Sequence, residues 1–290
     1  MGDDAPRKLA TLVDLERYPI DQADSEAYRV AVDAARGDLA ATGCAVIEGM
    51  LHADGLQTLS REILECKPST HYSTESINPY FHTEESASYP ERHPLNTFIK
   101  RTSGFIPGDA WPAGSAMEML FRSPELACFV ADALRTRTLY CYADPLAGLT
   151  ANILDPGQQF TWHFDTNEFA VTVLVDAADE GGQFEYVPDI RSATDENFDV
   201  VQGILEGGQD DIVTLPLSPG DLQIFRGRYS LHRVTRVGSA SGPRHAAIFA
   251  YTVEPGVIGR VARTRQLFGR VLQEHLDAER KRVRSDTLVD

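Results

Sequence analysis

The chain has 290 residues, which is enough for one large domain or two small ones. Its formal net charge of -16 argues against nucleic acid as the main partner, because an acidic surface repels phosphate. No run of about eighteen apolar residues and no signal peptide occurs, and the four cysteines lack metal-ligand spacing, so we expect a cytoplasmic protein with reduced thiols and no membrane association.

The first part of the chain, residues 1–137, is expected to be a mainly helical part that packs on a catalytic core. Apolar residues recur at helical spacing in several of its segments, and Gly43 marks the end of the first. A short apolar run after Gly43 predicts a strand. In chain order, the expected elements are a helix over Ser25–Ala41, a strand over Cys44–Gly49, a helix over Asp54–Cys66, and helices over 114–121 and 124–136.

Within this part, residues 68–112 are rich in Ser, Thr, Glu, His, Tyr and Pro and show little periodicity. A long segment of this kind is usually a binding loop, a lid or a disordered insertion. We expect it to act as a lid over a small polar ligand. The candidate contacts on it are Tyr80, His82, Glu84, Glu85 and His93.

Residues 138–258 change to short strands separated by turn signals, which predicts a sandwich or barrel. Residues 259–290 have the pattern of a basic amphipathic helix over Gly259–Arg284. We expect the three parts to form a single catalytic domain. The predicted strands are Thr138–Tyr142, Leu149–Leu154, Phe160–His163, Phe169–Val175, Gln183–Val187, Ile212–Leu217, Asp221–Phe225, His232–Val237 and Arg244–Val253.

Three His-x-Asp pairs could each contribute to a metal site, and His82-Thr-Glu84 is a variant of the pattern. Local context separates them. The pair at 52 and 54 begins a helix, where Asp54 is better explained as an N-cap. The pair at 275 and 277 lies within a predicted helix, whose geometry points the two side chains apart. His163 and Asp165 follow a predicted strand, so they project from one face and can hold one ion, with Asn167 on the same side.

A third ligand must come from elsewhere in the chain, and His232 beside a predicted strand is the best candidate. His245 is the competitor. It follows Arg244 on a strand, so the two residues face opposite ways, and we assign Arg244 inward. Two imidazoles and one carboxylate leave three octahedral positions open, which suits Fe(II). Zinc with the same ligands remains an alternative, although the His-Glu-x-x-His signature is absent.

An arginine beyond the metal ligands could bind the carboxylate of an organic acid through paired hydrogen bonds. Arg244 is the candidate for this role. Spacing alone leaves several neighbouring arginines as competitors, namely Arg226, Arg228, Arg233 and Arg236.

The chain resembles the 2-oxoglutarate/Fe(II)-dependent dioxygenases over about residues 138–256. The similarity is greatest in Trp162–Phe169, in Gly181–Pro188, and from Pro219–Leu222 to His232–Val234. It is nearest to the branch of amino-acid hydroxylases and radical halogenases that act on free basic amino acids.

This resemblance implies a mainly β fold with flanking helices, a double-stranded β-helix or jelly roll, with Fe(II) inside and with 2-oxoglutarate and O2 as co-substrates. It assigns the iron to His163, Asp165 and His232, and the far carboxylate of 2-oxoglutarate to Arg244. Asn152 is a further candidate contact for 2-oxoglutarate. Where many members have Ser two residues after the arginine, this chain has Ala246.

The resemblance also bears on the reaction. In the halogenases of this branch, Gly or Ala replaces the metal carboxylate and chloride takes its place. Asp165 is present here, so we expect hydroxylation. The expected substrate is a small polar molecule such as a free amino acid or another amine-containing metabolite. Its candidate contacts are Asn167, Glu168, Trp162 and His82, although strand alternation points Trp162 and Glu168 away from the ion.

Other outcomes remain open from the sequence. The same iron could support desaturation, cyclisation or oxidative deamination. A jelly-roll protein could also bind a metal or ligand without catalysis, and a homodimer is compatible with the sequence.

Overall fold

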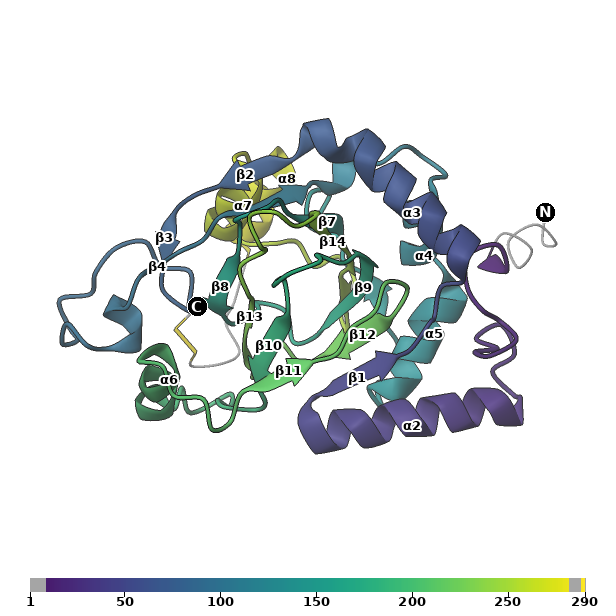
Figure 1. Cartoon of the computed structure of the whole chain (residues 1–290), viewed down its shortest axis with the longest axis horizontal. Coiled ribbons are helices and arrows are strands. Elements are labelled where there is room, and N and C mark those ends of the chain that lie inside the picture. The colour runs from purple at the N-terminus through teal and green to yellow at the C-terminus, as the bar shows by residue number, and fades with distance from the viewer. Residues whose placement is uncertain (1–8, 282–287, 290) are drawn as a thin grey trace.

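The computed structural model describes residues 9–281 and 288–289, and its centre consists of two antiparallel sheets (Figure 1). The larger sheet contains, in spatial order, β1 (Cys44–Ile47), β12 (Leu222–Phe225), β9 (Ala170–Asp176), β14 (Arg244–Phe249), β7 (Leu149–Leu154), β5 (Ser103–Ile106) and β2 (His71–Ser73). The smaller sheet contains β11 (Val213–Leu215), β10 (Phe184–Val187), β13 (Leu231–Val234) and β8 (Phe160–His163). Two short pairs complete the strands, β3 (Ser76–Ile77) with β4 (Ile99–Lys100), and β6 (Tyr140–Cys141) with β15 (Tyr251–Thr252). The expected jelly roll with flanking helices is confirmed.

A layer of helices covers the outer face of the larger sheet (Figure 1). It consists of α2 (Glu26–Thr42), α3 (Ala53–Cys66), α4 (Ala116–Phe121) and α5 (Pro124–Ala133). The first of these begins where Ser25 accepts a hydrogen bond from the Tyr28 N–H, and it ends at Gly43, whose φ of 69° favours glycine. The N-cap residue of α3 is His52. Asp54 is therefore not the expected N-cap but an exposed residue in the first turn of the helix.

The strands β7, β12 and β14 of the larger sheet are buried on both faces, because one face meets the helices and the other meets the smaller sheet. On β14, Arg244 lines the space between the two sheets, whereas Phe249 packs in the apolar core under the helices. On β7, Asn152 likewise lines the space between the sheets, whereas Ile153 packs in the apolar core under the helices. This alternation explains how an almost continuously buried strand can still present polar groups to an internal cavity.

The structure differs from the sequence-based expectations in three segments. The polar segment 68–112 contains four strands, and two of them, β2 and β5, extend the larger sheet. A helix that was not expected, α6 (Phe198–Leu205), follows β10. The prediction of a single C-terminal helix is wrong. Helix α7 (Val261–Phe268) ends at Gly269, whose φ is 69°, and a second helix, α8 (Gln273–Glu279), follows. The expected continuation over 282–284 lies outside the described residues.

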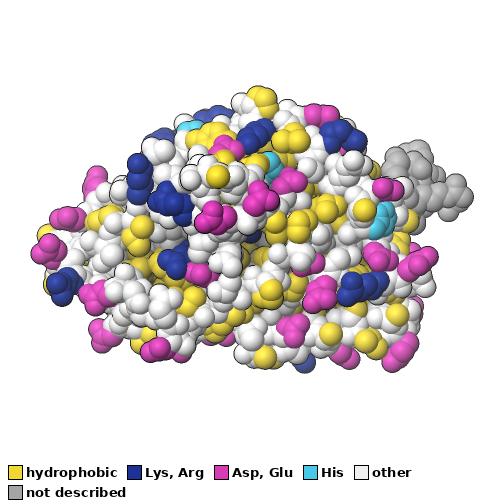
Figure 2. Space-filling model, in the orientation of Figure 1, with side chains coloured by type: hydrophobic (Ala, Val, Ile, Leu, Met, Phe, Trp, Pro, Cys, Tyr) yellow, Lys and Arg dark blue, Asp and Glu magenta, His cyan; other side chains and the backbone are white. Residues whose placement is uncertain are grey.

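On the face shown in Figure 2, acidic side chains are spread over the surface with basic side chains among them, as the net charge leads us to expect. Across the described ranges, we find no helix with the length and apolarity needed to cross a membrane.

A buried pair of side chains holds the C-terminal helices to the jelly roll. His275 on α8 is fully buried, and its Nε2 lies 3.0 Å from the Asp144 carboxylate. The same carboxylate accepts backbone hydrogen bonds from Leu146, Ala147 and Gly259. Asp144 therefore fixes the segment that leads into α7.

We predict that Asp144→Ala lowers the free energy of unfolding by at least about 2–3 kcal/mol, because several buried donors lose their acceptor at once. Chemical denaturation measures this change. The matched control is Asp277→Ala, an exposed carboxylate on the same helix as His275, which should change stability little. Equal stability of the two variants would contradict a structural role for Asp144.

Candidate metal and co-substrate site

Two histidines far apart in the sequence meet across neighbouring strands. His163 is the last residue of β8 and lies directly opposite His232 on β13 in the antiparallel register. The centroids of their rings are 4.0 Å apart. Sheet pairing, rather than closeness in sequence, therefore brings the two imidazoles together.

The hydrogen bonds of each imidazole determine which nitrogen is available to a metal. His163 Nδ1 lies 2.7 Å from the Thr161 carbonyl oxygen, and His232 Nδ1 lies 2.9 Å from the Ser230 carbonyl oxygen. A carbonyl can only accept, so Nδ1 carries the proton in both rings. The Nε2 lone pairs are then free to bind a cation, which is the usual arrangement in metal-binding histidines.

Asp165 lies just beyond β8, and its backbone N–H donates to the Gly227 carbonyl. A Cβ atom added at Gly227 would lie 1.9 Å from the Asp165 Oδ2 atom and 2.7 Å from its Cγ atom. Any larger residue at this position would therefore displace the carboxylate. Glycine at position 227 makes room for the third ligand.

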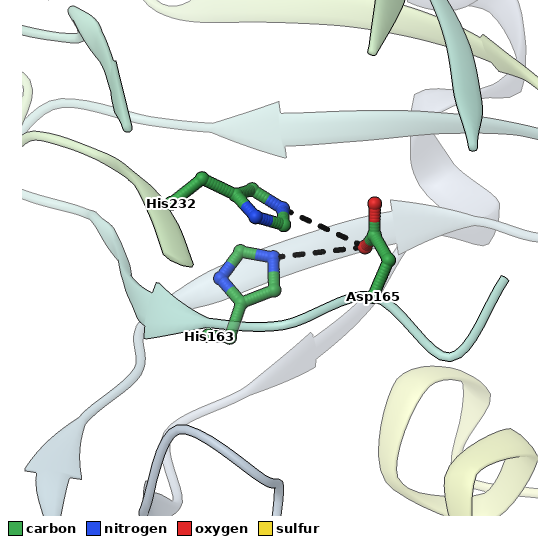
Figure 3. A group of neighbouring side chains, drawn as sticks. All are labelled: His163, Asp165 and His232. Carbon is green, nitrogen blue, oxygen red and sulfur yellow. Dashed lines mark ion pairs between the residues drawn. The ribbon is translucent and has the colours of Figure 1, made fainter. Parts of the chain in front are cut away.

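The three side chains point toward one another (Figure 3). The Oδ1 atom of Asp165 lies 3.6 Å from His232 Nε2 and 4.0 Å from His163 Nε2. Metal–ligand bonds of about 2.0–2.2 Å place two ligands of one ion roughly 3–4 Å apart. His163, Asp165 and His232 thus have the separation and the donor atoms to hold a divalent ion on one face, with the other positions open.

The electrostatic surroundings favour the protonation states that a metal needs. Burial lowers the pKa of His163 well below its usual range, and neighbouring His232 lowers it further. Burial alone would raise the pKa of Asp165, but His232, His163 and Arg263 outweigh this effect and lower it to about 2. At neutral pH the site therefore offers a neutral imidazole and an ionised carboxylate.

Aromatic rings fix the two imidazoles from the sides. The Phe160 ring stacks on His163 at 3.9 Å between centroids, and the Phe225 ring meets His232 edge to face at 4.9 Å. Phe81 also contacts His163, with centroids 5.4 Å apart. These contacts restrict rotation of the rings and hold both Nε2 atoms in place.

A cavity of about 180 Å³ lies between the two sheets and contains the three ligands. Arg244 lines the same cavity and is buried. Within the described part of the chain, its guanidinium has no hydrogen-bond or ion-pair partner, and burial lowers its pKa to about 10. The adjacent His245 faces away and binds Asp176 at 2.8 Å. A buried cation without a partner in a cavity indicates a site for an anionic ligand.

Of the other predicted site residues, some line the cavity and others lie outside it. Asn152 and Asn167 line the cavity, and the Asn152 amide also donates to the Gly104 carbonyl. Trp162 is buried outside the cavity, under the Arg233 guanidinium, and Glu168 is exposed. His82 binds the Val289 carbonyl at the edge of the molecule. None of the five candidate contacts on the polar segment lines the cavity.

The sequence did not predict two groups of residues at the site. Arg260 and Arg263 reach the cavity from the beginning of α7, in a segment for which the sequence predicts a basic amphipathic helix but no site residue. Phe81 reaches the His163 ring from a turn in which its own φ is 66°. The only sequence signal for it was an aromatic residue within an otherwise polar segment.

Comparison with known proteins places the chain in a family. The family model described as halogenase D matches residues 111–255, which is half of the chain. The chain belongs to the halogenase D family. No curated protein matches it.

Solved structures share the fold of the chain. A 2OG-Fe(II) oxygenase family oxidoreductase from Burkholderia pseudomallei aligns with a TM-score of 0.50 and 14% identity, covering 78% of this chain and 92% of the other. AviO1 from Streptomyces viridochromogenes Tue57 gives a TM-score of 0.52 and 15% identity, covering 79% and 96%. The resemblance to the 2-oxoglutarate/Fe(II) oxygenases is confirmed at the level of fold. With the His-Asp-His set and buried Arg244, the residues fit Fe(II) and 2-oxoglutarate.

We predict that Asp165→Ala weakens Fe(II) binding by about 100-fold or more, because even the loss of outer-shell partners costs about 10–100-fold. Anaerobic titration with Fe(II) in chloride-free buffer measures this. Asp54→Ala, in an exposed His-x-Asp pair, is the matched control and should bind iron as the natural chain does. If both variants retained full affinity, the site would lie elsewhere.

Proposed function

We propose that the protein hydroxylates an unactivated C–H bond of a small polar substrate, with a free amino acid as the expected class. The observation that carries the oxygenase chemistry is the buried Arg244 guanidinium in the same cavity as the metal ligands. A dicarboxylate co-substrate bound in this cavity would contact both Arg244 and the metal ion. One carboxylate would bind Arg244, while the opposite end would reach the ion.

Each protein group has a defined part in the reaction. His163, Asp165 and His232 would hold Fe(II), which would supply the activation of O2 coupled to conversion of 2-oxoglutarate to succinate and CO2. Arg244 sets the orientation of 2-oxoglutarate. The aromatic walls keep water away from the ion and restrict the substrate to one approach.

Asp165 favours oxygen transfer over halogen transfer, even though the family model is described as a halogenase. Chloride needs the coordination position that a missing carboxylate would vacate. Here Asp165 faces both imidazole Nε2 atoms, and Gly227 leaves room for it. The protein thus provides three ligands of its own, and chloride has no comparable vacancy.

We predict that Arg244→Gln weakens 2-oxoglutarate binding by roughly 10- to 100-fold, because a buried charge-assisted contact of about 1.5–3 kcal/mol is lost. Anaerobic titration of the Fe(II) protein, followed by its visible charge-transfer band, measures the affinity. Arg226→Gln is the control, because Arg226 does not line the cavity. Unchanged affinity in Arg244→Gln would assign the co-substrate to another residue.

Products distinguish the reaction types. With a substrate found by screening for succinate release, we expect a product heavier by one oxygen atom that takes its label from O2. Added chloride should leave that product unchanged. A chlorinated product would indicate halogenation instead of hydroxylation. A product lighter than the substrate by two hydrogen atoms would indicate desaturation. Failure of every tested compound to release succinate would favour a binding protein.

A further inference from the structure

Part of the cavity that contains the candidate metal ligands is lined by α7 and by the residue before it. Arg260 and Arg263 both line the cavity there, together with Thr264, Leu267 and Phe268. Arg260 is the N-cap residue of α7 and Arg263 lies in its first turn. Because both side chains line the same cavity, the two guanidinium groups can act on the same ligand. By contrast, Arg265 on the same helix is exposed and does not line the cavity.

The charges of the cavity lining are strongly unequal. Among the described residues that line it, Arg244, Arg260 and Arg263 are the arginines and Asp165 is the only carboxylate. Asp165 belongs to the candidate metal site, and Arg244 is suited to 2-oxoglutarate. The described lining therefore provides no further carboxylate for a cationic substrate, while Arg260 and Arg263 supply positive charge for an anionic one.

The other residues that line the cavity are mainly apolar. They include Phe105, Phe160 and Leu267, while Thr166 and Asn167 add neutral polar groups close to Asp165. Such a lining suits a ligand with one anionic end and a short apolar body.

We propose, on the basis of the hydroxylase function above, that Arg260 and Arg263 bind an anionic group of the substrate. The substrate is then an organic acid with a short apolar body, recognised by its carboxylate or phosphate, and not a cation recognised by its amine. A free amino acid fits through its carboxylate. Anchoring one end at α7 places a C–H bond of the body at the metal.

The attachment of α7 supports a fixed position for this anion site. The Gly259 N–H, directly before Arg260, donates to the buried Asp144 carboxylate. Arg263 also lies over the Phe81 ring, which contacts the metal ligand His163. The two arginines are thus held by the same contacts that hold the helix and the metal site.

Two probes that differ only in the charged end test the proposal without turnover. The Zn(II)-loaded protein, saturated with 2-oxoglutarate so that Arg244 is occupied, is titrated with hexanoate and with hexylamine by calorimetry. We expect hexanoate to bind and hexylamine to bind at least about 10-fold more weakly. Hexyl phosphate distinguishes a phosphate site from a carboxylate site. Equal binding of the amine and the acid, or binding of neither acid, overturns the proposal.

Variants then assign the residues. Arg263→Gln and, separately, Arg260→Gln should each weaken binding of the preferred acid by about 10-fold or more, with 2-oxoglutarate affinity unchanged. Arg265→Gln is the matched control on the same helix and should leave both affinities unchanged. Retained acid binding in both cavity variants overturns the proposal. Succinate release is scored separately, so failure of the hydroxylase function would be visible even if the anion site were present.

Discussion

The pairing of β8 with β13 is the constraint on which the rest of the site depends. Because His163 and His232 lie opposite each other, their rings come within 4.0 Å between centroids, with their planes tilted by 53°. Backbone carbonyls two residues earlier then orient both rings in the same manner. A slip of one residue in this register would turn one imidazole to the outer face of the sheet and abolish the metal site.

Much of this arrangement could be predicted from the sequence. Two strands, Leu149–Leu154 and Phe160–His163, have the predicted bounds, because alternating side chains and turn residues are local signals. The inward position of Arg244 and the outward position of His245 followed from the same alternation. Candidate metal ligands could be selected among the competing His-x-Asp pairs, because of these pairs only His163 and Asp165 lie at a strand end.

The remainder depends on contacts between segments that are distant in the sequence. The strands in the polar segment are short, and β2 and β5 are stabilised by pairing with the larger sheet rather than by a pattern of their own. Likewise, no periodicity indicates that His275 is buried against Asp144, or that Arg260 and Arg263 face the cavity. Basic residues on an amphipathic helix have the same pattern whether they meet water or a ligand.

The contact between Gly227 and the Asp165 carboxylate has a consequence for the evolution of the family. Because a Cβ atom at position 227 and a carboxylate at position 165 would occupy the same space, the two positions cannot vary independently. A relative that loses the carboxylate is released from the need for glycine, and a side chain at 227 would prevent the carboxylate from returning. The type of reaction would then depend on two residues from different loops. A single substitution at position 165 would not restore the carboxylate ligand once position 227 carries a side chain.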